Sequence, residues 1–304
     1  MKRAGLLLLL AGVIAGWWML RPTSWSESDL PTHTPDAIAG EKIFWAGGCA
    51  SCHATPVNGR RARDADRLLL GGGMELDTPF GVFRMPNISP HVSDGIGDWS
   101  ELDFVNAMQF GVSPSGLHYY PAFPYASYAR MRTEEVMDLF AYIMQLEPVA
   151  SERPDHALVF PWNLRSGIGL WKRLYLDPAP VIVLSTEDSV LQHGQALVEG
   201  AGHCGECHTP RNSLGGIDKS RWLVGAPNLE GRGGVPDITP VAEGFGDWSE
   251  SDIVYYLETG FTPDFDAVGG SMVAVQENMA MLDAADREAI ARYLKALPAN
   301  QPAE

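Results

Sequence analysis

Apolar residues recur every three or four positions in two stretches of the chain, one near its middle and one near its end. This spacing places them on one face of a helix. The stretches cover residues 133–146 and 283–297, and each is followed by a proline, Pro148 or Pro298. They predict two amphipathic helices that pack on a core. The apolar faces consist of Val136, Leu139, Phe140 and Ile143, and of Ile290, Tyr293, Leu294 and Leu297.

A shorter helical signal precedes each of these helices. Residues 100–103 (Ser-Glu-Leu-Asp) and 249–252 (Ser-Glu-Ser-Asp) place a hydroxyl at a helix start and a carboxylate three residues later, the pattern of a capping box. Gly111 and Gly260 then predict where these helices end. The remaining sequence is rich in glycine and proline, with 32 and 22 residues. Such long loops need more than an apolar core to fold around, and a large prosthetic group would provide it.

The two signals belong to a longer internal repeat. Corresponding segments occur in the same order and are 149 to 155 residues apart, which predicts two homologous domains, residues 37–150 and 187–300. A connector, residues 151–186, joins them. The matching segments are residues 49–53 and 204–208, 86–90 and 236–240, 97–101 and 246–250, and the two amphipathic stretches.

The N-terminus has the pattern of an export signal. Lys2 and Arg3 precede a 17-residue uncharged run that Arg21 closes, and basic residues favour the cytoplasmic side. The following residues do not form a small-x-small cleavage site, so we expect an uncleaved transmembrane anchor at residues 1–21 and a tether at 22–36, with the rest outside the cytoplasm. A cleaved signal that releases the protein is the alternative.

Charge narrows the possible functions. The chain has 22 basic and 38 acidic residues, a formal net charge of −16 at pH 7. So acidic a chain repels phosphate backbones, which argues against a nucleic-acid-binding protein. Two explanations of the acidic surface stay open: solvation, and steering toward a basic redox partner.

All four cysteines lie in two copies of one pattern, Cys-x-x-Cys-His. A c-type haem is attached through two thioethers to cysteines at this spacing, and the adjacent histidine binds the iron. A thioredoxin-like pair would occur once, and a zinc site would need four ligands around one ion. The pattern therefore predicts two covalently bound haem c groups. Their residues are Cys49, Cys52 and His53 for the first and Cys204, Cys207 and His208 for the second.

A haem that only carries electrons usually has a sixth ligand, and a methionine sulfur raises its potential. In the second domain Met272 follows two glycines, which would let the backbone approach the porphyrin. We predict Met272 as this ligand; Met279 and Met281 are the alternatives, and each could instead fill the core.

The first domain has Phe123, which cannot bind iron, at the centre of the corresponding loop. We predict Met131, just before the helical stretch, as its sixth ligand. The alternatives are Met85, the nitrogen ligands His91 and His118, or an open position.

Six segments of the chain, taken together, resemble the multihaem cytochrome c subunits of membrane-bound bacterial dehydrogenases for alcohols, gluconate and aldehydes. The resemblance implies an all-α fold of two tandem class I cytochrome c domains, with His53 and His208 proximal and Met272 distal. Some relatives with Phe at the position of Phe123 carry Met at that of Met131. Arg211 would pair with a haem propionate or lie at the surface. The resembling segments are residues 78–81, 86–88, 95–101, 120–125, 202–212 and 268–272.

The connector is aromatic and basic at residues 160–165 and 169–173. It is either a clasp that packs on both domains or a docking strip for a partner.

The patterns and the resemblance together predict a dihaem cytochrome c, tethered to the bacterial inner membrane on its periplasmic side. It would carry electrons from a dehydrogenase to another cytochrome or a terminal oxidase, and it would not be an enzyme. Alternatives are a dihaem peroxidase or thiosulfate-oxidising enzyme with an open distal site, and a haem subunit of a terminal oxidase.

Overall fold

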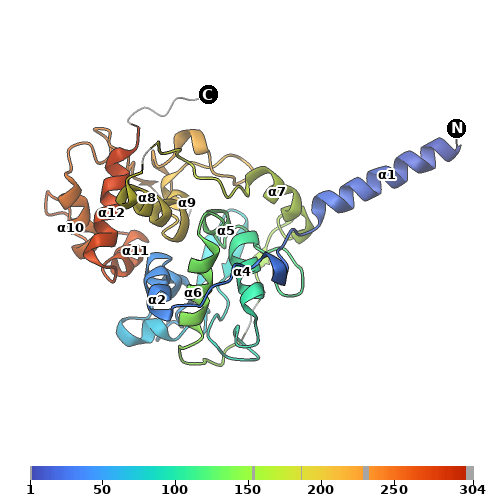
Figure 1. Ribbon diagram of the computed structural model, residues 1–304, viewed down its shortest axis with the longest axis horizontal. Coiled ribbons are helices and arrows are strands. Elements are labelled where there is room, and N and C mark those ends of the chain that lie inside the picture. The colour runs from blue at the N-terminus through green and yellow to red at the C-terminus, as the bar shows by residue number, and fades with distance from the viewer. Residues whose placement is uncertain (1, 153–154, 186, 229–232, 299–304) are drawn as a thin grey trace.

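The computed structural model describes residues 2–152, 155–185, 187–228 and 233–298 (Figure 1). The predicted segments 1–21, 151–186 and 187–300 include a few positions outside these ranges. The described chain is mainly helical, and a long N-terminal helix projects from a body of shorter ones. The helices are α1 (Lys2–Leu20), α2 (Ala37–Ala46), α3 (Cys49–His53), α4 (Glu101–Phe110), α5 (Tyr125–Tyr128), α6 (Thr133–Ile143), α7 (Ile168–Tyr175), α8 (Ser189–Gln195), α9 (Gly205–His208), α10 (Glu250–Thr259), α11 (Met272–Met279) and α12 (Ala284–Ala296). Shorter turns are the 3₁₀ helices η1 (Glu27–Asp29), η2 (Asp64–Leu68), η3 (Arg165–Gly167) and η5 (Lys219–Arg221) and the π-helical turn η4 (Ala196–Ala201).

Helices of the same kind follow one another in both repeats. In each, the first helix packs against the last: α2 against α6, and α8 against α12. A glycine stands at each contact. A Cβ on Gly40 would lie 2.0 Å from the Asp138 carbonyl oxygen, and one on Gly194 would lie 1.9 Å from that of Ala289. Only glycine therefore lets the backbones approach this closely.

The two predicted amphipathic helices are confirmed as α6 and α12. Their apolar residues are buried where the 3.6-residue period placed them. These are Val136, Leu139, Phe140 and Ile143 in the first repeat, and Ile290, Tyr293, Leu294 and Leu297 in the second.

The predicted capping boxes are confirmed in α4 and α10. The hydroxyls of Ser100 and Ser249 accept hydrogen bonds from backbone amides three residues on, at 3.1 and 3.2 Å. Gly111 and Gly260 end the two helices in the left-handed conformation, with φ of 60° and 78°. A side chain would strain this conformation, so the sequence fixes both helix ends.

The prediction of an all-α chain needs a correction, because two small antiparallel sheets are present. Strand β1 (Glu75–Thr78) pairs with β2 (Gly81–Arg84), which pairs with β3 (Ala157–Leu158) from the connector. In the second repeat β4 (Ala226–Pro227) pairs with β5 (Gly234–Val235). These strands are too short to show a two-residue period, and β3 reaches its partner from a distant part of the sequence.

Helix α1 occupies the predicted anchor segment. Its C-terminal end is attached to the body, because the Arg173 guanidinium donates to the Trp18 and Met19 carbonyls at 2.8 and 3.0 Å. His118 Nε2 lies 2.8 Å from the Leu20 carbonyl oxygen. Crossing a bilayer takes about 20 mainly apolar residues, and within the described ranges no helix combines that length with that apolarity. The predicted transmembrane anchor at residues 1–21 is therefore not supported.

The connector is a clasp between the repeats. On the first repeat, Lys172 Nζ of α7 donates to the carbonyls of Phe110 and Gly111 at 2.6 Å each, at the end of α4. On the second, Trp171 Nε1 donates to the Leu214 carbonyl at 3.0 Å. One helix thus contacts both repeats. A docking role for the connector stays a prediction.

The repeats also pack directly on each other. Helix α11 of the second repeat contacts α2 and α3 of the first, and α5 of the first contacts η4 of the second (Figure 1). Buried apolar residues of both repeats form one continuous cluster.

Candidate haem-binding sites

Each Cys-x-x-Cys-His pattern forms a single helical turn. In the first repeat this turn is α3, preceded by Gly48 with φ of 60°; in the second it ends in α9, preceded by His203 with φ of 38°. Before haem is attached, burial raises the pKa of the Cys49 and Cys204 thiols to about 12.

Both predicted proximal histidines are held in the same way. His53 Nδ1 lies 2.8 Å from the Pro86 carbonyl oxygen, and His208 Nδ1 lies 2.8 Å from that of Pro236. A carbonyl oxygen can only accept, so Nδ1 carries the proton and Nε2 keeps its lone pair for a metal. Burial lowers the pKa of both imidazoles, which favours the neutral form that binds iron. This donor set fits a haem iron in each repeat.

A glycine forms a backbone hydrogen bond with each of these histidines. The amides of Gly72 and Gly225 donate to the carbonyls of His53 and His208 at 2.8 Å. Both glycines have positive φ, 72° and 82°. A Cβ on Gly72 would lie 2.5 Å from the Pro86 carbonyl carbon, and one on Gly225 would lie 2.7 Å from the backbone of the facing strand β5. Only glycine therefore fits between each attachment turn and the segment that orients its histidine.

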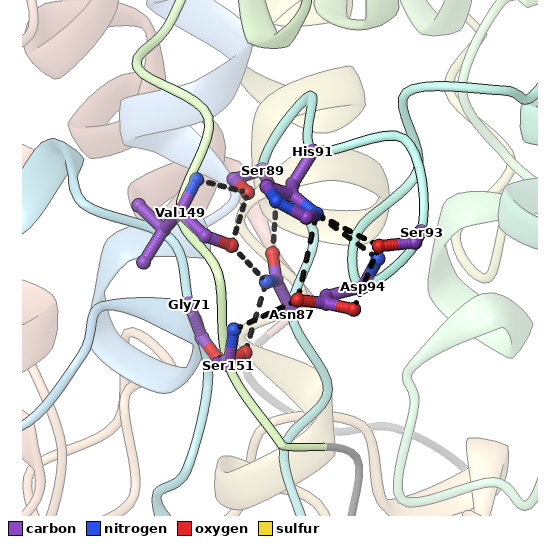
Figure 2. A network of polar contacts seen from close by, with 8 residues as sticks. All are labelled: Gly71, Asn87, Ser89, His91, Ser93, Asp94, Val149 and Ser151. Atoms are coloured by element: carbon purple, nitrogen blue, oxygen red, sulfur yellow. Dashed lines mark hydrogen bonds and ion pairs between the residues drawn. The ribbon is translucent and has the colours of Figure 1, made fainter.

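In the first repeat a polar network fixes the segment that carries Pro86 (Figure 2). The Asn87 amide nitrogen donates to the Val149 carbonyl at 2.6 Å and to Ser151 at 2.9 Å, while its oxygen accepts from the Ser89 amide at 2.8 Å. Asn87 is buried, so these bonds are made away from water. Val149 and Ser151, at the end of the first repeat, thus hold in place the segment whose Pro86 carbonyl accepts from His53.

Met131, the predicted sixth ligand of the first haem, lies between α5 and α6 and is buried. It lines a small pocket together with Cys49, so the structure brings these two predicted site residues together. Gln109 Nε2 donates to the Met131 carbonyl at 2.9 Å and fixes this part of the backbone. Buried Met108 lines the same pocket. The sequence does not indicate Met108 as a candidate ligand, because its position in a helical apolar pattern is that of an ordinary core residue.

The other residues considered as the sixth ligand of the first haem lie in different surroundings. Met85 directly precedes Pro86, on the Nδ1 side of His53. Phe123 packs against Tyr119 and Tyr128 with ring centroids 5.8 Å apart. The two candidate histidines make other contacts: His91 Nδ1 accepts from the Asp94 amide at 3.1 Å, and His118 bonds to the Leu20 carbonyl.

Met272, the predicted ligand in the second repeat, is the first residue of α11 and is partly buried. Gly270 before it has φ of 60°, and a Cβ there would meet no described atom within 4 Å. The alternatives differ in burial: Met279 is in the core, and Met281 is 52% exposed. The roles of Met131 and Met272 as ligands stay predictions.

Arg211 lies beside the second attachment turn. Its guanidinium donates to the Glu206 carboxylate and, at 2.8 Å, to the Gly215 carbonyl. Arg211 and Glu206 border a cleft of about 490 Å³ between α5, α7 and α9. Within the described part of the chain the buried Arg211 Nε has no acceptor, which leaves one donor suited to a carboxylate. Pairing with a haem propionate stays a prediction.

The sequence model of the family described as "Cytochrome c" matches residues 37–147. A diheme cytochrome c-type protein of Cereibacter sphaeroides is 49% identical to the chain over 300 residues, which are 97% of each protein. The chain belongs to the cytochrome c family. Membership confirms the predicted covalent haem c and the prediction of an electron-transfer protein rather than an enzyme. The relative is itself dihaem, as the two patterns predict for this cytochrome.

The predicted resemblance to dehydrogenase subunits is also confirmed. The fructose dehydrogenase cytochrome subunit of Gluconobacter japonicus is 36% identical over 295 residues, 96% of this cytochrome and 58% of that protein. The gluconate 2-dehydrogenase cytochrome c subunit of Pantoea cypripedii is 34% identical over 282 residues, 87% of this cytochrome and 60% of that protein. This cytochrome spans about three fifths of both subunits.

Proposed function

We propose that this cytochrome carries two haem c groups and relays single electrons from a dehydrogenase to another cytochrome or a terminal oxidase. The observation that supports this most directly is the repeated arrangement of His53 with Pro86 and His208 with Pro236. Haem iron supplies the one-electron chemistry. The chain's own residues fix the imidazoles and keep them neutral. A dehydrogenase donor is supported by the relatives that are dehydrogenase cytochrome subunits.

We place this relay on the periplasmic side of the bacterial inner membrane. Lys2 and Arg3 followed by an uncharged run support export. Fractionation of the native cells tests this part. The haem-stained protein should leave with the periplasm or remain with the membranes after the cells are opened, and recovery with the cytoplasm would contradict the placement.

Film voltammetry of the purified protein tests the relay itself. We expect two reversible one-electron waves, and no catalytic current on addition of hydrogen peroxide or thiosulfate. Mass spectrometry of the same sample should show two haems attached to one chain. A single haem, or a catalytic current, would contradict the proposal.

Deletion of the gene tests the donor. Oxygen uptake by the membranes should fall for a dehydrogenase substrate, and alcohols, fructose and gluconate are the probes suggested by the relatives. Unchanged uptake on every oxidisable substrate that the wild-type membranes respire would contradict a dehydrogenase donor.

A further inference from the structure

The two attachment turns make corresponding contacts across the interface between the repeats. Ser51 is the third residue of the first Cys-x-x-Cys pattern, and Glu206 is the third residue of the second. Asn278 Nδ2 of α11 donates to Ser51 Oγ at 2.6 Å. Ser127 Oγ of α5 donates to Glu206 Oε1 at 2.8 Å. Each turn is therefore bound by a helix of the opposite repeat.

These two helices hold corresponding places in their repeats. Helix α5 lies between the capped helix α4 and the closing helix α6, and α11 lies between α10 and α12. Both are next to a predicted sixth ligand. Met272 is the first residue of α11, and Met131 follows the end of α5 by three residues.

The contact through Asn278 is partly buried and is made on both sides of its amide. The side chain is fully buried. Its Oδ1 accepts from the guanidinium of Arg67 in the first repeat, and Arg67 lies 4.5 Å above the ring of Trp45. Ser51 Oγ in turn lies 3.4 Å from the Ala274 carbonyl of α11. A buried amide with both ends satisfied cannot shift without leaving a polar group unpaired.

The contact through Ser127 is partly buried as well. Ser127 is fully buried, and the side chain of Glu206 is only 11% exposed. Arg211 holds the Glu206 carboxylate from the other side. Nearby, His203 Nε2 lies 3.3 Å from the Gly47 carbonyl, which joins the residues that precede the two turns. The orientation of α5 is thus fixed by the second attachment turn.

We propose that each attachment turn positions the sixth ligand of the other repeat. Ser51 fixes α11 through Asn278 and so places Met272, while Glu206 fixes α5 through Ser127 and so places Met131. The inference rests on the proposed function and on the sequence prediction that these two methionines bind iron. Asn278 and Met272 lie within the same helix α11, less than two turns apart, so a displacement at one end moves the other. Ser51, Asn278, Glu206 and Ser127 are positioning residues.

Potentiometry of the haem-loaded protein tests this inference. Asn278→Ala should lower the midpoint potential that Met272→Leu also lowers, and should weaken the red-region sulfur-to-iron absorption of the ferric protein. Ser127→Ala should act on the other potential, the one that Met131→Leu lowers. Ser51→Ala, a milder change, should act on the same haem as Asn278→Ala. The matched control is Glu277→Gln, which breaks an ion pair with Arg61 at the same interface and should leave both potentials unchanged.

Thermal unfolding of the same variants provides a readout that does not depend on the iron. The losses in Tm from Ser51→Ala and Asn278→Ala should be less than additive in the double variant, because the two share one hydrogen bond. Strict additivity would overturn the contact. A lower Tm for Asn278→Ala with both potentials and the absorption unchanged would overturn the positioning role. A dihaem wild type without any sulfur-to-iron absorption would instead refute the predicted methionine ligands and leave the proposed electron relay standing.

Discussion

His53 Nδ1 lies 2.8 Å from the Pro86 carbonyl oxygen, and the two residues are 33 positions apart. The corresponding pair in the second repeat, 28 positions apart, has the same distance. The two intervening loops therefore differ in length by five residues but end in one geometry. What both preserve is an acceptor that fixes the imidazole tautomer, which is the feature a proximal ligand requires.

Gly72→Ala should strongly destabilise the first repeat. Its Cβ would collide with the backbone at Pro86 in a left-handed conformation, and we expect a loss of roughly 3 kcal/mol or more in the free energy of unfolding. Haem content measured as the pyridine haemochrome should fall as well. Gly59→Ala is the control, because φ there is 69° and a Cβ meets nothing; it should cost only about 1 kcal/mol. Equal losses in the two variants would show that the collision is unimportant.

The sequence alone indicates the attachment turns and the capped helices, because each depends on neighbouring residues. Cys-x-x-Cys-His fits one helical turn, and a capping box needs only four residues. The acceptors Pro86 and Pro236 could not be assigned in this way, since no local pattern links them to a histidine about 30 positions earlier. The same holds for Asn278, which looks like a polar residue of a short helix until the opposite repeat is placed against it.

The stability of the fold should depend on pH through a contact between α8 and α12. In this contact His193 Nε2 lies 2.6 Å from Asp286 Oδ1. The hydrogen bond to Asp286 raises the pKa of His193 above 6.5, and the same bond lowers the pKa of Asp286 below 3.8. Because folding raises the pKa of His193, this group stabilises the fold below pH 6.5, and the stabilisation is lost as the pH rises through the pKa of the folded state. Because folding lowers the pKa of Asp286, this group stabilises the fold above pH 3.8, and the stabilisation is lost as the pH falls through the pKa of the folded state.

His193→Gln should therefore lower Tm more at about pH 5 than at about pH 8.5. The effect should be modest, since His193 is nearly half exposed and water screens the pair. Scanning calorimetry at constant ionic strength measures it. A Tm difference that does not change with pH would contradict this assignment.

Lys172→Met should loosen the clasp between the repeats. It removes the donor to the Phe110 and Gly111 carbonyls at the end of α4 while keeping the length of the side chain. We expect a loss of about 1–2 kcal/mol in the free energy of unfolding by denaturant. Lys219→Met is the matched control, because its ion pair with Asp177 is at the surface and should contribute little. Similar losses from both variants would mean that the carbonyl contacts do not stabilise the fold.

Met272→Leu and Met131→Leu should each lower one midpoint potential and leave the other unchanged. Loss of the thioether removes the ligand that raises the potential of its haem, while leucine keeps most of the packing volume. The controls are Met279→Leu and Met137→Leu, two buried methionines whose replacement should change Tm but neither potential. Unchanged potentials in Met131→Leu, together with a shift in Met85→Leu or Met108→Leu, would assign the first sixth ligand to that other methionine. The pocket that Met131 and Met108 share with Cys49 favours these two methionines over Met85, because a sixth ligand must approach the same porphyrin to which Cys49 is attached.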